Sequence, residues 1–197
     1  IDACLVGSEM CIRDRIETDI HSTKDKKFVC FHDFTLKRIF KISKSIKNIN
    51  YEDLKKIKNK NFQIPPLKEV LKISKKKFPI FIEIKPLFNK ELLSNLIKET
   101  RSFKKCTFIS FKHENIYNLL KLNSNLSVGL SFSNKSSIKS ILKSSLNKKI
   151  KYLILDKKFL NSRRIQIINK EKYYYTIKNK KEFLKYEKDN NLIFENL

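Results

Sequence analysis

From residue 16 to the end of the chain, short β-prone apolar runs alternate with segments whose apolar residues recur at helical spacing. This alternation predicts a parallel sheet covered by helices, because parallel strands need long crossover connections. The run at 78–85 is apolar almost throughout, which suits a strand buried on both faces. We expect about seven strands of the parallel type, one fewer than a closed (β/α)8 TIM barrel has. These strands are expected at 16–20, 78–85, 106–111, 126–132, 152–156, 173–177 and 192–194.

Residues 1–15 do not match the rest of the chain in composition. They hold the only Ala, the only Met, one of two Gly and two of six Arg. Residues 5–14 also resemble one reading frame of a transposon-end sequencing adapter. We therefore interpret residues 1–15 as a non-native segment and residues 16–197 as the domain. On this interpretation the native first strand is missing, which accounts for a barrel one strand short.

Acidic side chains follow a regular pattern near the start of the domain. Glu17 and Asp19 alternate with apolar residues in the first strand, so both carboxylates point to one face. Two neighbouring carboxylates repel each other unless a cation lies between them. Glu83 lies within the apolar run at 78–85, where burial is costly without a partner. These acids and Lys85 fall toward the carboxyl ends of strands, where barrel active sites lie, and His32 directly follows another β-prone run, at 28–31.

An ordered set of motifs resembles the glycerophosphodiester phosphodiesterase family across residues 16–197. The matching segments are Ile16-Glu-Thr-Asp-Ile-His-Ser-Thr-Lys-Asp25, Val29-Cys-Phe-His-Asp-Phe-Thr-Leu-Lys-Arg38, Ile64-Pro-Pro-Leu-Lys-Glu-Val-Leu71, Ile82-Glu-Ile-Lys85, Ile109-Ser-Phe111 and Tyr175-Thr-Ile-Lys-Asn179. The resemblance implies a (β/α)8 barrel of the phospholipase C-like phosphodiesterase type. It also implies metal-dependent hydrolysis of small glycerophosphodiesters to glycerol 3-phosphate and an alcohol, in glycerophospholipid degradation.

The same resemblance implies a role for each matched site residue. Glu17, Asp19 and Glu83 would ligate a divalent cation, Ca²⁺ or Mg²⁺, and hard oxygen ligands suit either ion. His32 would be one of two catalytic histidines, and Lys85 would contact the phosphate. His21 and His113 are interpreted as structural or peripheral.

The chain also departs from the family pattern. The His-Arg-Gly and Glu-Asn motifs of the family's first strand are absent, and with them the other histidine, so this chain is expected to be impaired or inactive as written. Lys26 stands where the family usually has Gly in a turn, Pro66 where it has Thr, and Tyr175 where it has a substrate-side Trp.

The basic composition leaves a second function open. The formal charge of +24 is typical of proteins that bind nucleic acid, so the alternative is a nucleic-acid-binding protein on a degenerate, inactive barrel. However, 38 of the 44 basic residues are Lys, spread evenly, which indicates an AT-rich genome. We therefore expect no specific nucleic-acid partner, and Tyr173–Tyr175 to form core and rim rather than a platform for bases.

The cysteines and the hydropathy pattern indicate the cellular compartment to expect. Cys4, Cys11, Cys30 and Cys106 have no metal-site or redox spacing, so free thiols and a reducing, cytoplasmic compartment are expected. No apolar run is long enough for a membrane span. The oligomeric state and the alcohol group of the substrate stay open.

Overall fold

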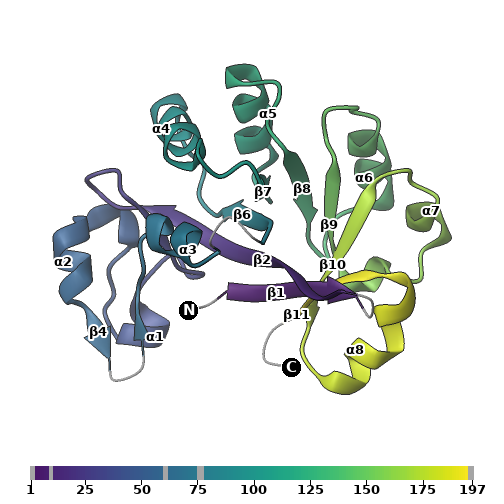
Figure 1. Ribbon diagram of the computed structural model, residues 1–197, viewed down its shortest axis with the longest axis horizontal. Coiled ribbons are helices and arrows are strands. Elements are labelled where there is room, and N and C mark those ends of the chain that lie inside the picture. The colour runs from purple at the N-terminus through teal and green to yellow at the C-terminus, as the bar shows by residue number, and fades with distance from the viewer. Residues whose placement is uncertain (1–2, 9–10, 60–61, 75–77, 195–197) are drawn as a thin grey trace.

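The computed structural model describes residues 3–8, 11–59, 62–74 and 78–194. Its main sheet has nine strands in the order β1-β11-β10-β9-β8-β7-β6-β2-β3, and β1 also pairs with β2. Because β1 pairs with both β11 and β2, the sheet closes on itself as a barrel does, and β3 lies outside the closed ring. Figure 1 shows the curled sheet with α4, α5, α6 and α7 fanned around its outer side.

The seven expected parallel strands are all present and pair in chain order. They are β2 (Cys11–Ser22), β6 (Ile80–Ile84), β7 (Cys106–Ser110), β8 (Val128–Phe132), β9 (Tyr152–Asp156), β10 (Glu171–Ile177) and β11 (Asn191–Phe194). In most of these strands the residues that point to either face of the sheet are buried, as the apolar runs indicate.

The eighth place in the barrel differs from the expectation. We expected it to be empty, but β1 (Ala3–Ser8) lies there, antiparallel to both β11 and β2. Leu5 pairs with Phe194 on one side and with Ile16 on the other. Only two residues of sequence separate β1 from β2, and strands separated by so few residues can pair only in the antiparallel direction. The barrel is thus closed by a hairpin strand, not by a parallel first strand.

Helices follow most of the parallel strands and cover the outer face of the sheet. They are α3 (Leu67–Ile73), α4 (Lys90–Thr100), α5 (His113–Leu122), α6 (Ile138–Ser145), α7 (Arg163–Gln166) and α8 (Lys180–Tyr186), with 3₁₀ turns at Lys157–Phe159 and Glu187–Asp189. Ser137 caps α6, because its side chain accepts a hydrogen bond from Ser140 N. Asn89 and Asn179 cap α4 and α8 in the same way.

A small lobe is inserted between β2 and α3 and carries His32. It begins with β3 (Phe28–Cys30), which pairs antiparallel with β2 and is therefore not a barrel strand. The lobe continues through α1 (Lys37–Phe40), a 3₁₀ turn at Ile46–Asn48, α2 (Tyr51–Lys56), β4 (Lys58–Asn59) and β5 (Phe62–Gln63). A separate apolar cluster that includes Val29, Phe31 and Leu54 holds it together. In Figure 1 this lobe lies at the left.

The interior of the barrel is filled by side chains. Phe81, Ile109, Ile154, Tyr173 and Ile193 form its buried cluster. Tyr173 and Tyr174 are almost fully buried, at 2% and 1% exposed, so they belong to the core as expected and cannot stack on bases.

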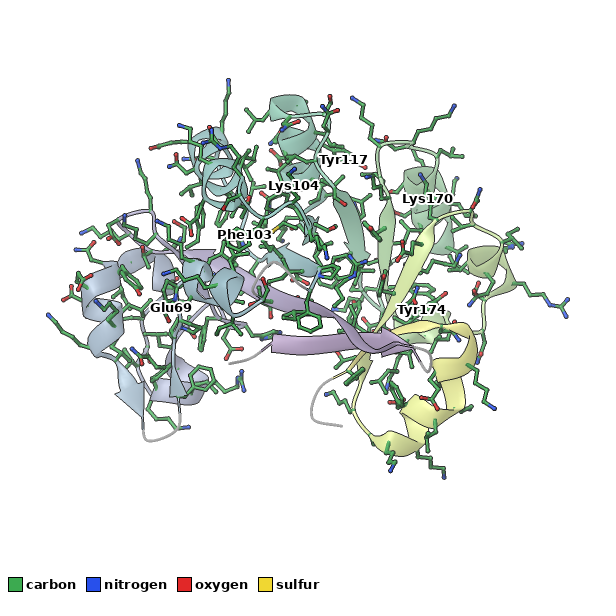
Figure 2. The ribbon with its side chains drawn as sticks, in the orientation of Figure 1. Glu69, Phe103, Lys104, Tyr117, Lys170 and Tyr174 are labelled. Atoms are coloured by element: carbon green, nitrogen blue, oxygen red, sulfur yellow. The ribbon has the colours of Figure 1, made fainter. Side chains whose placement is uncertain are left out.

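In Figure 2 the blue nitrogen ends of side chains of the described residues project on many sides of the outline of the molecule. Cys30 and Cys106 are buried free thiols, as expected, whereas the side chains of Cys4 and Cys11 lie outside the described structure. Among the described helices, none has the length and apolar character needed to cross a membrane.

Candidate active site

The site begins with three carboxylates on two neighbouring strands. Glu17 and Asp19 lie two residues apart on β2, and Asp19 is in register with Glu83 on β6. All three side chains are buried, with 7%, 7% and 6% of each residue exposed. One oxygen from each carboxylate lies within 4.8 Å of the others. The sequence-predicted ligand set is therefore brought together, and its oxygen atoms suit a hard divalent cation.

Lys85 follows β6 and reaches back into this carboxylate cluster. Its Nζ lies 2.9 Å from Asp19 Oδ1 and 2.7 Å from Glu83 Oε1, and the side chain is 14% exposed. Burial alone would lower the pKa of Lys85, but the charges of Glu83 and Asp19 hold it above its ordinary value. Lys85 is therefore a fixed positive charge inside the site.

The pKa of Glu83 shows that the charge of Lys85 does not fully offset the effects of burial and of the neighbouring carboxylate. Burial raises the pKa of Glu83 to about 7, against the attraction of Lys85, and the charge of Asp19 raises it further. Lys85 therefore does not fully compensate the burial of ionised Glu83, and a divalent cation would add to that compensation. The described residues thus fit a divalent cation in the chemistry of their oxygen donors and in the raised pKa of Glu83.

His32 lies at the edge of this cluster, on the lobe. Its side chain is 59% exposed, and its Nδ1 is 2.9 Å from Asp33 Oδ1. Arg38 holds Asp33 from the other side, with Nε 2.6 Å from Oδ2 and Nη2 3.1 Å from Oδ1. The hydrogen bond from Arg38 lowers the pKa of Asp33, so Asp33 stays ionised. The imidazole of His32 is therefore oriented by an anchored carboxylate, and its charge also acts on Glu83.

His21 lies beside the carboxylate cluster, a position that the sequence interpretation of His21 as structural or peripheral does not specify. It lies on β2 with the same two-residue spacing as Glu17 and Asp19, is 3% exposed, and packs edge-on against Phe34 with ring centres 5.2 Å apart. Burial lowers its pKa to about 4, against a hydrogen bond with the backbone of His32. It is thus a neutral buried group beside the site, and its alternation with the two acids was the signal that could have placed it there.

Aromatic side chains border the site on the far strands. The Tyr175 hydroxyl donates to the carbonyl oxygen of Phe132 at 3.0 Å, and its ring meets Phe111 edge-on at 5.7 Å. Burial raises the pKa of Tyr175 well above its ordinary value, and the charges of Asp156 and Glu83 add to this shift. Tyr175 therefore lies within electrostatic reach of the carboxylates. His113, by contrast, is 2.9 Å from the carbonyl oxygen of Ser131 and has a structural role, as expected.

Solved structures share this fold. A phosphodiesterase from Oleispira antarctica, in complex with the product sn-glycerol-3-phosphate, is 20% identical with a TM-score of 0.76, covering 90% of this chain and 79% of that chain. A glycerophosphodiester phosphodiesterase from Thermotoga maritima is 23% identical with a TM-score of 0.69, covering 90% and 80%. Another from Parabacteroides distasonis is 19% identical with a TM-score of 0.68, covering 90% and 78%. No curated protein sequence matches the chain.

The sequence profile described as the glycerophosphoryl diester phosphodiesterase family matches residues 13–188. The match begins within β2 and ends beyond α8, so it includes all three carboxylates, Lys85 and His32. Members of this family are glycerophosphodiester phosphodiesterases, which are phosphoric diester hydrolases. With most of its length covered, the chain belongs to the glycerophosphoryl diester phosphodiesterase family.

Proposed function

We propose that this protein hydrolyses glycerophosphodiesters to glycerol 3-phosphate and an alcohol with the help of a bound divalent cation. The observation that carries the proposal is the buried cluster of Glu17, Asp19 and Glu83 with Lys85 in contact with two of the three carboxylates. The product named for the structurally similar Oleispira antarctica enzyme, sn-glycerol-3-phosphate, supports the same substrate class. Degradation of glycerophospholipids is the process that such a reaction would serve.

Glu17, Asp19 and Glu83 are the proposed ligands of Ca²⁺ or Mg²⁺. When bound, the cation would withdraw electron density from the phosphodiester and make phosphorus open to attack. The three carboxylates reach the cluster from two paired strands, so their positions are set by the sheet and not by a loop. This rigidity favours a site of defined size.

Lys85 is the proposed phosphate contact. Its ammonium group is a permanent charge in a mostly buried site, where it interacts with an anion more strongly than it would in water. Two carboxylates already fix its position, so little reorganisation is needed when a phosphate oxygen binds.

His32 is the proposed proton-transfer group. Its Nδ1 faces Asp33, so Nε2 is the atom that would take or give a proton. Tyr175 and Phe111, whose rings meet edge-on, are the proposed border of the pocket for the glycerol or alcohol group of the substrate.

The decisive experiment measures glycerol 3-phosphate release from glycerophosphocholine and glycerophosphoethanolamine at high protein concentration, because the rate is expected to be low without the family's first-strand motifs. We expect release to stop in EDTA, to return with Ca²⁺ or Mg²⁺, and to be lost in Glu83→Gln. Glu69→Gln is the matched control, since Glu69 is an exposed glutamate on α3 away from the cluster. Release that is unaffected by EDTA, or that survives in Glu83→Gln, would contradict the proposed site.

We also propose that residues 16–197 are the native functional domain and that residues 1–15 are a non-native segment, which in this chain supplies β1. The family match begins at residue 13, and the proposed site residues begin at Glu17. An uninterrupted read across the 5′ end of the gene tests this proposal. Codons for the same fifteen residues in that read would contradict it.

A further inference from the structure

Two fully buried polar residues join the loops on the site side of β6 and β7. Ser110 ends β7 and Asn115 lies in the first half of α5, and both are 0% exposed. Neither is charged, and neither belongs to the carboxylate cluster. Because buried polar groups are costly unless they are hydrogen-bonded, the bonds that these two make are the reason they are tolerated there.

Their hydrogen bonds converge on the segment that carries Lys85. Ser110 Oγ donates to the carbonyl oxygen of Ile84 at 2.7 Å. Asn115 Nδ2 donates to the carbonyl oxygen of Pro86 at 2.8 Å. Lys85 stands between Ile84 and Pro86, so both carbonyl groups that flank it are held by buried side chains.

Further bonds make the arrangement specific. Asn115 Oδ1 accepts from Phe88 N at 2.9 Å, and Asn115 Nδ2 also lies 3.3 Å from Ser110 Oγ. A backbone N–H must donate and a carbonyl must accept, so only one orientation of the Asn115 amide satisfies both Phe88 and Pro86. Ser110 Oγ in turn accepts from Lys112 N at 3.0 Å. The network thus ties the segment after β6 to the segment after β7.

We propose that Ser110 and Asn115 are positioning residues that fix the backbone on both sides of Lys85 and so hold its ammonium group against Asp19 and Glu83. This inference rests on the proposed function, in which Lys85 contacts the phosphate. The lysine side chain has a flexible four-carbon stem. Fixing its backbone at both neighbouring carbonyl groups limits where Nζ can reach.

The rest of the Lys85 backbone is held less firmly. Its own amide donates to the carbonyl oxygen of Ile20 at 3.3 Å, a longer contact than either flanking bond. A displacement of about 1 Å in a positioning contact is enough to lower rates by about a hundredfold. Loss of the two flanking hydrogen bonds is therefore expected to displace Lys85 Nζ and to weaken its proposed contact with the phosphate.

Ser110→Ala is the main variant, and Ser74→Ala is its matched control. Ser74 is also buried, at 2% exposed, and its Oγ donates to the carbonyl oxygen of Leu71 at the same 2.7 Å, but it lies at the end of α3 away from the site. Both variants remove one buried serine hydroxyl with a backbone acceptor. Asn115→Asp is a second variant, because it keeps the acceptor for Phe88 N and loses the donor to Pro86. Ser110→Ala places no charge in the buried network and is therefore the safer variant for folding.

The test uses the full chain saturated with Mg²⁺ or Ca²⁺. We expect Ser110→Ala to lower kcat/KM at least tenfold while Ser74→Ala stays within twofold of wild type, with both variants unfolding at similar urea concentrations. In a Lys85→Met background, Ser110→Ala should have less than a twofold further effect, because the residue it positions is gone. An equal loss of activity in both backgrounds, or equal effects of Ser110→Ala and Ser74→Ala, would overturn the proposal.

A binding measurement separates this inference from the proposed function. Inorganic phosphate is titrated into the metal-loaded protein by calorimetry, which needs no turnover. If wild type binds phosphate but releases no glycerol 3-phosphate, the proposed function fails, and weaker phosphate binding in Ser110→Ala still supports the positioning role. Unchanged phosphate binding in Ser110→Ala contradicts it. Wild type that neither hydrolyses substrate nor binds phosphate overturns both.

Discussion

Replacing Glu83 by glutamine is expected to stabilise the metal-free protein at alkaline pH while abolishing its response to metal. In the fold, burial raises the pKa of Glu83 from 4.5 to about 7. The unfolded chain releases this proton near its ordinary pKa, whereas the folded chain retains it until about pH 7. The unfolded state therefore binds fewer protons in this interval, and the free energy of unfolding falls as the pH rises through it.

The size of the effect follows from the same values. At about 1.4 kcal/mol for each pH unit between the two pKa values, ionised Glu83 lowers the free energy of unfolding by about 3 kcal/mol above pH 7. Glutamine at this position carries no charge at any pH. We thus expect Glu83→Gln to be more stable than wild type by about 2–3 kcal/mol at pH 8 and by less than about 1 kcal/mol at pH 5. The lower end of this range reflects the weaker contact that an uncharged amide makes with Lys85.

Urea unfolding in EDTA at pH 5 and pH 8 measures this difference. Circular dichroism is the suitable signal, because the chain has no tryptophan. Glu69→Gln, which changes an exposed glutamate in the same way, should follow wild type at both pH values. Added Ca²⁺ or Mg²⁺ should then stabilise wild type but not Glu83→Gln, because only a ligand that binds the folded state raises its stability. A difference between Glu83→Gln and wild type that is the same at pH 5 and pH 8 would refute the argument.

Other substitutions test the barrel, the turn and the histidine. Gly129→Ala should lower the free energy of unfolding by about 1–3 kcal/mol in urea, because a Cβ there would lie 2.8 Å from Tyr152 Cβ and 2.9 Å from its carbonyl oxygen; unchanged stability would contradict this. Lys26→Gly should raise it by about 1 kcal/mol, since Lys26 has a φ of 62° where the family usually has Gly; a loss in the same urea assay would contradict that. Asp33→Asn should lower kcat at least about tenfold in the metal-saturated protein, because the group that orients His32 Nδ1 changes from a carboxylate, which only accepts hydrogen bonds, to an amide, which can also donate them. Steady-state kinetics with unchanged kcat would show that Asp33 has no such role.

The barrel strands and the carboxylate cluster could be predicted because they depend on local pattern. The alternation of Glu17 and Asp19 with apolar residues fixes which way both side chains point in any strand. The apolar run around Glu83 indicates a neighbouring buried strand, and parallel strands align their carboxyl ends. The register of Asp19 with Glu83 then follows closely from the fold.

Other features depend on contacts between distant segments and leave no local signal. Asn115 reads as an ordinary polar helix residue, yet its partners Phe88 and Pro86 are 27 and 29 residues away. The run at 28–31 was read as a strand, but its antiparallel pairing with β2 depends on the turn at Lys24–Lys27. The antiparallel direction of β1 likewise follows from its hairpin connection, which outweighs the parallel order of the other barrel strands.

The charge of the cluster determines the order in which ligands can bind. Asp19 and Glu83, when ionised, carry two negative charges against one positive charge on Lys85, which leaves this trio with a net negative charge. A divalent cation reverses the sign of this charge, whereas a monovalent ion only cancels it. A phosphodiester is itself an anion, so the metal-free site repels it and the metal-loaded site does not. We therefore expect sn-glycerol 3-phosphate to bind in calorimetry only after Ca²⁺ or Mg²⁺, and Na⁺ at the same ionic strength not to substitute. Equal affinity of the metal-free and metal-loaded protein for sn-glycerol 3-phosphate would contradict this order, because it would mean that Lys85 alone outweighs the two buried carboxylates that it contacts.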